Sequence, residues 1–126
     1  MGYVISHATK SKQITRGKGF EITIPDLDEK ALSISFLHIT GGRDPADFTK
    51  LLEPNKGFRA TYVALTDGIT VILHEKRETK SIALKARDII TITNGTSYEM
   101  SGAGDVIMFA MPAFSSDMFN LKKLRG

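Results

Sequence analysis

The stretch KARDIITITNGTSYEMSG, from Lys85 to Gly102, carries the pattern that decides the fold. Its first half is a short run of Ile and Thr, residues that favour β-strands. Asn94-Gly95 follows, a dipeptide typical of tight turns because both residues tolerate positive φ. The stretch therefore predicts a strand, a tight turn and a second strand, with Tyr98 just after the turn.

The rest of the chain repeats this rhythm of short strands and turns. The segments 20–25 and 31–40 alternate between apolar and polar residues, and the turn-forming residues between them predict a hairpin. Regular spacing of such segments predicts an all-β sandwich or barrel. Further strands are expected at 58–65, 69–75, 80–85 and 106–112, with turns at 66–68 (a hairpin turn), 76–79 and 102–105.

One segment departs from the strand pattern. Asp44 followed by Pro45 suits the start of a helix, and Pro54 suits its end. Phe48 and Leu51 fall on one face of such a helix. We expect one short helix or an ordered loop at 44–54, before the main barrel strands.

Composition limits the class of protein. The 126 residues suit a single domain, 1–126, with a real core. The net charge is +3, but the Lys and Arg residues alternate with acidic residues and form no continuous basic stripe, so no nucleic-acid partner is expected. The absence of Cys and of a long apolar segment favours a soluble, cytoplasmic protein with no membrane association.

The order of elements from Arg59 to Phe114 resembles the cupin superfamily, whose small RmlC-like members are double-stranded β-helix barrels of the jelly-roll type. In the second cupin motif, the Gly-Asp pair falls on Arg87-Asp88 and the turn Gly on Gly95. Gly68 matches the turn Gly of the first motif. Tyr98 stands where the family carries a metal-binding His. The resemblance implies an all-β jelly-roll barrel.

The metal ligands of that family are not matched. The Glu of the first motif falls on Thr61, and its His pair falls within 54–57, which contains no His. The three His of the chain, His7, His38 and His74, lie on different predicted elements. Because a transition-metal site needs several converging His, carboxylate or thiolate ligands, we expect no metal and no cofactor.

The resemblance also implies which side chains face the barrel interior. If Thr61 points inward as the family Glu does, then Arg59, Val63 and Leu65 do so too. Tyr98 would share the interior with Met100. On the last strand, either Val106, Met108 and Ala110 or the alternate set faces inward. The predicted ligand-binding residues are Arg59, Thr61, Tyr98, Met100 and Met108.

An apolar interior with a few polar groups suits a small organic ligand. The first hypothesis is a metal-free barrel that binds a small polar or anionic metabolite, with Arg59 as an anion-binding group. Tyr98 either contacts this ligand or fills the space of a metal.

Two other functions stay open. One is a metal-independent isomerase or epimerase acting on a sugar or similar carbonyl substrate, with His38 and Tyr98 as an acid–base pair. Against it, His38 shares a face with Ile34 and Phe36, which is typical of a hydrogen-bonded core His. The other is an interaction or regulatory subunit whose barrel is filled by its own side chains.

A homodimer is expected from the resemblance. The face assignment above leaves Ala60, Tyr62 and Ala64 pointing outward, which would give β-strand 58–65 a flat apolar outer surface. Cupins commonly dimerise through such a face or through exchanged N-terminal strands, for which 3–10 is the candidate here.

Overall fold

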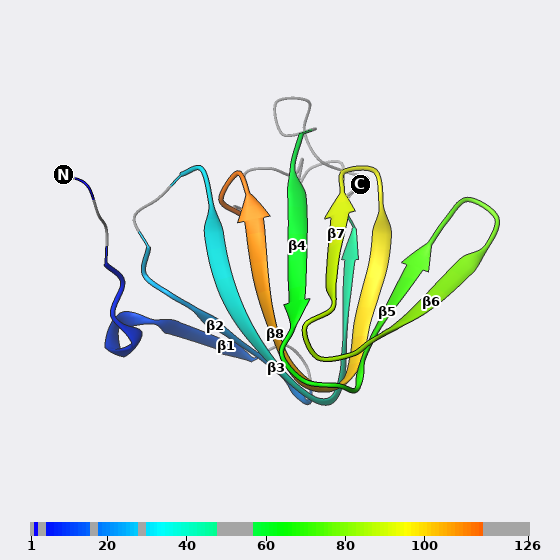
Figure 1. Cartoon of the computed structure of the whole chain (residues 1–126), viewed down its shortest axis with the longest axis horizontal. Coiled ribbons are helices and arrows are strands. Elements are labelled where there is room, and N and C mark those ends of the chain that lie inside the picture. The colour runs from blue at the N-terminus through cyan, green and yellow to red at the C-terminus, as the bar shows by residue number, and fades with distance from the viewer. Residues whose placement is uncertain (1, 3–4, 16–17, 28–29, 48–56, 115–126) are drawn as a thin grey trace, which may run out of the picture.

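The computed structural model describes residues 2, 5–15, 18–27, 30–47 and 57–114, and this part of the chain is almost entirely β-strand (Figure 1). None of its helices is long and apolar enough to cross a membrane. The elements are a 3₁₀ turn η1 (Ala8–Lys10) and the strands β1 (Lys12–Thr15), β2 (Phe20–Ile24), β3 (Ser33–Asp47), β4 (Arg59–Ala64), β5 (Ile69–His74), β6 (Thr79–Leu84), β7 (Ile89–Thr93) and β8 (Ser97–Met111).

Two long strands, β3 and β8, hold the barrel together. They pair antiparallel along their whole lengths, with a shift of register between Thr40 and Arg43. On one side of this bend they form a sheet in the order β1-β2-β3-β8-β4-β7 (Figure 1). On the other side, the first half of β8 pairs with β5, and β5 pairs with β6. We call these layers the first and the second sheet; together they form the predicted jelly-roll barrel.

Glycines shape the corner where β8 passes from one sheet to the other. Gly102 has φ +108° and Gly68 has φ +97°, a region that L side chains rarely adopt. A Cβ on Gly102 would overlap the carbonyl oxygen of Gly68, and one on Gly68 would lie 2.6 Å from that of Ala103. The expected turn at 102–105 is therefore wrong: these residues form a bend inside one continuous strand.

The turns connect the strands differently than the sequence predicts. The turn at 76–79 joins β5 and β6 as a true hairpin. The turn at 66–68 does not make a hairpin, because β4 pairs with β7 and β8 while β5 pairs with β6 and β8. Asn94-Gly95 likewise leads from β7 in the first sheet to the half of β8 in the second. Turn residues encode a reversal of the chain but not the partner of the next strand.

The helix expected to start at Asp44 is wrong at its first turn, because β3 continues through Asp47. The remainder of that segment, 48–56, lies outside the described residues. The N-terminal segment proposed as an exchanged strand is partly outside them as well, and Ala8–Lys10 forms a 3₁₀ turn.

Alternation along the strands defines the interior. On β4, Ala60, Tyr62 and Ala64 are buried, while Arg59 is exposed and Thr61 is only partly covered. The predicted faces of this strand are therefore reversed, since a slip of one residue in the family alignment moves every side chain to the opposite face. The expected dimer surface of Ala60, Tyr62 and Ala64 is wrong for the same reason.

Two other assignments agree with the structure. Tyr98 and Met100 are 2% exposed and lie in the core, as expected. On the last strand, Val106 and Ala110 are buried and Met108 packs against the core, so this set faces inward. The core also includes Phe20, Leu37, Ile39, Phe58, Ile69, Val71, Leu84 and Ile92.

Candidate functional site

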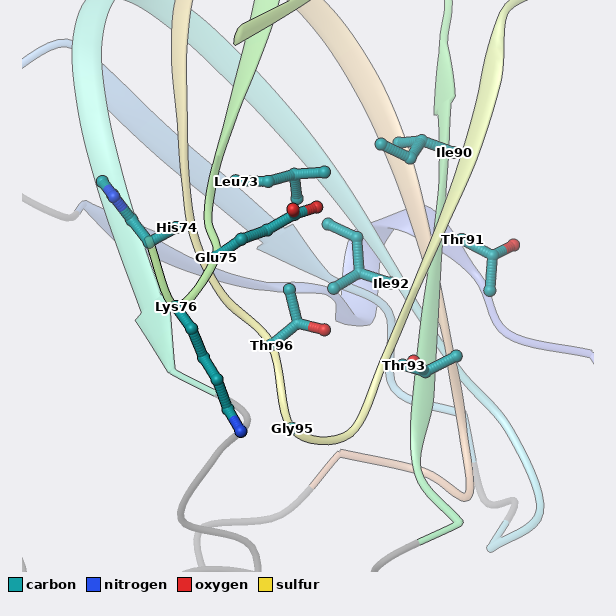
Figure 2. A pocket seen from close by; sticks show the side chains of 10 residues that line it. All are labelled: Leu73, His74, Glu75, Lys76, Ile90, Thr91, Ile92, Thr93, Gly95 and Thr96. Atoms are coloured by element: carbon teal, nitrogen blue, oxygen red, sulfur yellow. The ribbon is translucent and has the colours of Figure 1, made fainter. Parts of the chain in front are cut away.

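A cavity of about 420 Å³ opens at one end of the barrel, between β5 and β7. Figure 2 shows Leu73 and Glu75 reaching into it from one side, Ile90 and Ile92 from the other, and Thr96 from below. His74 and Thr91 point away from this space (Figure 2). The lining residues are Leu73, His74, Glu75, Lys76, Ile90, Thr91, Ile92, Thr93, Gly95 and Thr96.

The local sequence explains this lining. Leu73 and Glu75 lie two positions apart, so the period of an extended chain carries both to the same side as β5 ends. Ile90 and Ile92 share a face of β7 in the same way. Three apolar side chains from two strands thus meet the carboxylate of Glu75 and the hydroxyl of Thr96, a combination that can hold an organic molecule and fix its orientation.

A pair of tyrosines lies behind the cavity. The hydroxyl groups of Tyr62 and Tyr98 are hydrogen-bonded to each other, and the rings meet edge to face with centroids 5.9 Å apart. In the strand register, Tyr98 is the partner of Leu73, and Tyr62 is the partner of Ile90. The pair therefore bridges the two sheets next to the cavity walls. Both side chains are buried, at 5% and 2% exposed, and neither lines the cavity.

The structure does not bring the predicted ligand-binding residues together. Tyr98, Met100 and Met108 face the interior, where they pack in the core. Arg59 and Thr61 lie on the outer face of the first sheet, where the Thr61 hydroxyl is hydrogen-bonded to that of Thr91 at 2.9 Å. The expected roles of Arg59 and Thr61 inside the barrel are therefore wrong.

His38 also lies outside the barrel. Its neighbours Leu37 and Ile39 are buried, so alternation turns His38 to the outer face, where its side chain is 53% exposed. There the Nδ1–H donates to Oδ1 of Asp105 at 2.7 Å. The expected core position of His38 is wrong, and so is its pairing with Tyr98, because the two lie on opposite faces of the barrel wall.

His74 belongs to a second cluster on the outer surface. Its Nε2 lies 3.3 Å from Oε1 of Glu99, and Nε of Arg43 lies 2.7 Å from Oε2 of the same carboxylate. This arrangement neutralises a carboxylate that is only 21% exposed. Across the described ranges, no three His, Cys, Asp or Glu side chains converge in a way that could hold a metal ion.

Sequence reasoning missed the residues that line the cavity. Glu75 ends the expected strand 69–75 and is given no function there, yet it shares the period-two face of Leu73. That alternation was the available signal for Glu75. No signal in the sequence places β5 opposite β7, since the two strands do not pair.

No protein-family model matches the sequence, and no curated protein matches it. Solved structures do resemble it. Pac13 from Streptomyces, a nucleoside dehydratase, has been solved with uridine in a form with one His substituted. That structure has a TM-score of 0.74 and 13% identity, covering 94% of this chain and 89% of its own.

Two further structures have the same architecture. KdgF from Halomonas sp. has a TM-score of 0.64 at 13% identity, covering 93% of this chain and 99% of its own. CENP-C of Drosophila melanogaster, solved bound to CAL1, has a TM-score of 0.63 at 13% identity, covering 85% of this chain and 83% of its own. The fold is that of the cupin superfamily. At this level of identity the likeness shows the fold alone.

Proposed function

We propose that the protein binds a small polar metabolite in the cavity between β5 and β7. The observation that carries this proposal is the lining, in which the apolar side chains of β5 and β7 meet the carboxylate of Glu75 and the hydroxyl of Thr96. A volume of about 420 Å³ falls within the range of small-molecule sites, roughly 300–1,000 Å³.

The charge of the lining narrows the class of ligand. The carboxylate of Glu75 accepts hydrogen bonds and repels anions. Arg59, the anion-binding group expected from the sequence, lies on the other side of the barrel wall. A neutral ligand that donates hydrogen bonds fits this cavity better than a carboxylate or a phosphate, although Lys76 stands at the rim.

A nucleoside is the first ligand to test. It is neutral, its sugar hydroxyls can donate to Glu75, and its flat base can pack against Leu73 and Ile92. The structural similarity to Pac13 solved with uridine supports the same choice.

The test is a calorimetric or NMR titration with uridine and the three other common ribonucleosides. We expect saturable binding at micromolar to millimolar concentration. The variant Glu75→Gln keeps the shape but removes the charge, so affinity should fall about tenfold, the value of one charge-assisted hydrogen bond. Glu78→Gln, in the same turn but outside the lining, is the matched control and should bind like the wild type.

Two results would contradict the proposal. One is the absence of saturable binding for every nucleoside tested. The other is an equal effect of Glu75→Gln and Glu78→Gln, which would place the ligand elsewhere.

A second candidate function is an interaction subunit without a small ligand. Its support is the dense interior behind the cavity, where Phe20, Tyr62, Tyr98 and Met100 fill the barrel. The likeness to CENP-C solved bound to CAL1 is consistent with it. This candidate gains weight if no ligand is found, and it turns attention to the outer surface.

A further inference from the structure

A second hollow, of about 310 Å³, lies on the outer face of the first sheet, where β2, β3 and β8 meet the end of β4. Its lining includes Thr23, Phe36, His38, Leu65 and Asp105. Phe36 and Leu65 are 44% and 48% exposed, so two large apolar side chains stand open to solvent beside the hollow. Apolar exposure of this kind, gathered around a hollow, marks an interaction site.

The strand register brings the polar and apolar parts of this hollow together. Phe36 and His38 lie two positions apart on β3, so both side chains point to the outer face. Asp105 is the cross-strand partner of His38 on β8, and Thr23 is that of Phe36 on β2. An imidazole, a carboxylate and an aromatic ring therefore share one small area of the surface.

The backbone of Asp105 is held by the loop that follows β4. Its N–H donates to the Thr66 hydroxyl at 3.0 Å, and its carbonyl oxygen accepts from the N–H of Leu65 at 2.8 Å. The carboxylate in turn accepts from Nδ1 of His38 at 2.7 Å. These contacts orient the imidazole from one side, as a carboxylate does for a His that accepts protons.

The same carboxylate decides which ring nitrogen carries the proton. An ionised carboxylate has no hydrogen to donate, so the proton of a neutral His38 lies on Nδ1. Nε2 is then left as a hydrogen-bond acceptor. Because the side chain of His38 is 53% exposed, this acceptor is open to a molecule that enters the hollow.

The charges beside the hollow disfavour anions. Glu21 is the cross-strand partner of His38 on β2, so a carboxylate lies on each side of the imidazole. A carboxylate or phosphate ligand would be repelled by both. A neutral hydroxyl can donate to Nε2 without this repulsion, and it loses its water more cheaply than a charged ammonium group does.

We propose that this hollow is a second binding site, for a flat apolar molecule that carries one acidic hydroxyl, such as a phenol. The ring packs against Phe36 and Leu65, and the hydroxyl donates to Nε2 of His38. Asp105 is the positioning residue that keeps Nε2 free of a proton. Glu21 and Asp105 together select against anions.

This site is separate from the cavity between β5 and β7, since the two share no lining residue. A ligand in the hollow and a nucleoside in the cavity would therefore shift the NMR signals of different backbone amides. Either proposal can fail without the other.

The first test is an NMR titration of the isotope-labelled full chain with para-cresol and with its methyl ether, which lacks the hydroxyl hydrogen. We expect saturable shifts at His38, Leu65 and Asp105, with a dissociation constant for para-cresol of about 1–10 mM, as suits so small a probe. The methyl ether should bind about fivefold more weakly, the value of one hydrogen bond. The anion para-toluate should not bind.

Substitutions separate the roles of the lining residues. In His38→Ala, para-cresol and its methyl ether should bind equally, because the acceptor is gone. His7→Ala is the matched control, since His7 is exposed and lies outside the hollow, and it should keep the preference for para-cresol. Leu65→Ser should weaken both probes alike, whereas Ile89→Ser, on the same sheet but outside the hollow, should weaken neither.

The role of Asp105 has a spectroscopic test. Long-range nitrogen–proton spectra at about pH 8 should show the proton of His38 on Nδ1 in the wild type. In Asp105→Ala the proton should no longer be fixed there, and the affinity for para-cresol should fall. Circular dichroism checks that each variant is folded. A wild-type proton on Nε2 would overturn the positioning role.

Three results would overturn the site itself. These are no saturable binding of para-cresol, the same preference for para-cresol in the wild type and in His38→Ala, and shifts confined to the cavity between β5 and β7. Tighter binding of benzylamine than of para-cresol would overturn the ligand class, because the carboxylates and not Nε2 would then hold the ligand.

Discussion

Tyr62 and Tyr98 join the two sheets within the core. Their hydroxyl groups are hydrogen-bonded to each other in a place with almost no access to water. A buried hydroxyl that loses its partner costs more than the hydrogen bond itself contributes, about 1–3 kcal/mol. The pair should therefore stabilise the contact between the sheets and keep the wall behind the cavity in place.

We expect a double-mutant cycle of Tyr62→Phe and Tyr98→Phe to show a coupling of about 1 kcal/mol in the free energy of unfolding. Urea denaturation measures it. The cycle of Thr61→Val and Thr91→Val is the control, because it removes an exposed bond between hydroxyl groups, and its coupling should be near zero. Equal couplings in the two cycles would contradict the structural role of the buried pair.

At the scale of single residues, the sequence predicts correctly which way some side chains point, but not others. The inward position of Tyr98 and Met100 follows from alternation and the turn before them. The inward and outward faces of β4 were assigned the wrong way round. The family's motif was aligned on Gly68 and counted back to Thr61, but β4 ends at Ala64, before that turn, so the count is off by one residue. Polarity is the better signal for the two faces of β4. Arg59 and Thr61 form the more polar set, which belongs on the outer face, whereas Ala60 and Tyr62 belong in the core.

At the scale of elements, the loop after β4 and the loop after β6 are hydrogen-bonded to each other. Asp88 accepts a hydrogen bond from the backbone of Lys85 at 2.9 Å, a local contact that its place at the strand start predicts. Asp67 accepts one from the backbone of Ala86 at 2.8 Å, in a different loop. The second contact has no sequence signal, because it depends on which strands the tertiary fold places side by side.

Substitution of the corner glycine should test how closely the strands approach. Gly102→Ala should cost at least about 3 kcal/mol of the free energy of unfolding, because positive φ and a clash with backbone add together. Gly95→Ala is the control: its φ is +85°, but a Cβ there meets nothing within 4 Å, so strain alone should cost about 1 kcal/mol. Urea titration measures both, and similar costs would show that the corner can open.

At the scale of the whole molecule, the barrel has a cupin fold. The all-β class and the jelly-roll arrangement could be predicted from short strands, turn residues and the cupin-like spacing. The cavity could not, because it depends on how β7 lies relative to β5 after closure.

The prediction of a metal-free protein belongs at this scale as well. His38 contacts Asp105, and His74 contacts Glu99. Both contacts lie on the outer surface, but on different sheets, so the two His side chains do not converge. We expect elemental analysis of untagged, dialysed protein to find far less than one equivalent of Fe, Mn, Ni, Cu or Zn. A cupin with an intact His and Glu motif, treated in the same way, is the positive control. A stoichiometric metal would contradict the prediction.

The long β8 strand also determines when the chain can fold during its synthesis in a cell. It pairs with β3, β4 and β5, and its partner β3 begins at Ser33, which pairs with Ala110 near the far end of the described chain. Until Ser97–Met111 has left the ribosome, one edge of each of these three strands stands unpaired, and such edges readily join to other chains. Folding must therefore come late, and contacts so distant in sequence make it slow. The yield of native protein will depend on synthesis rate and temperature more than the modest size of the chain would lead one to expect.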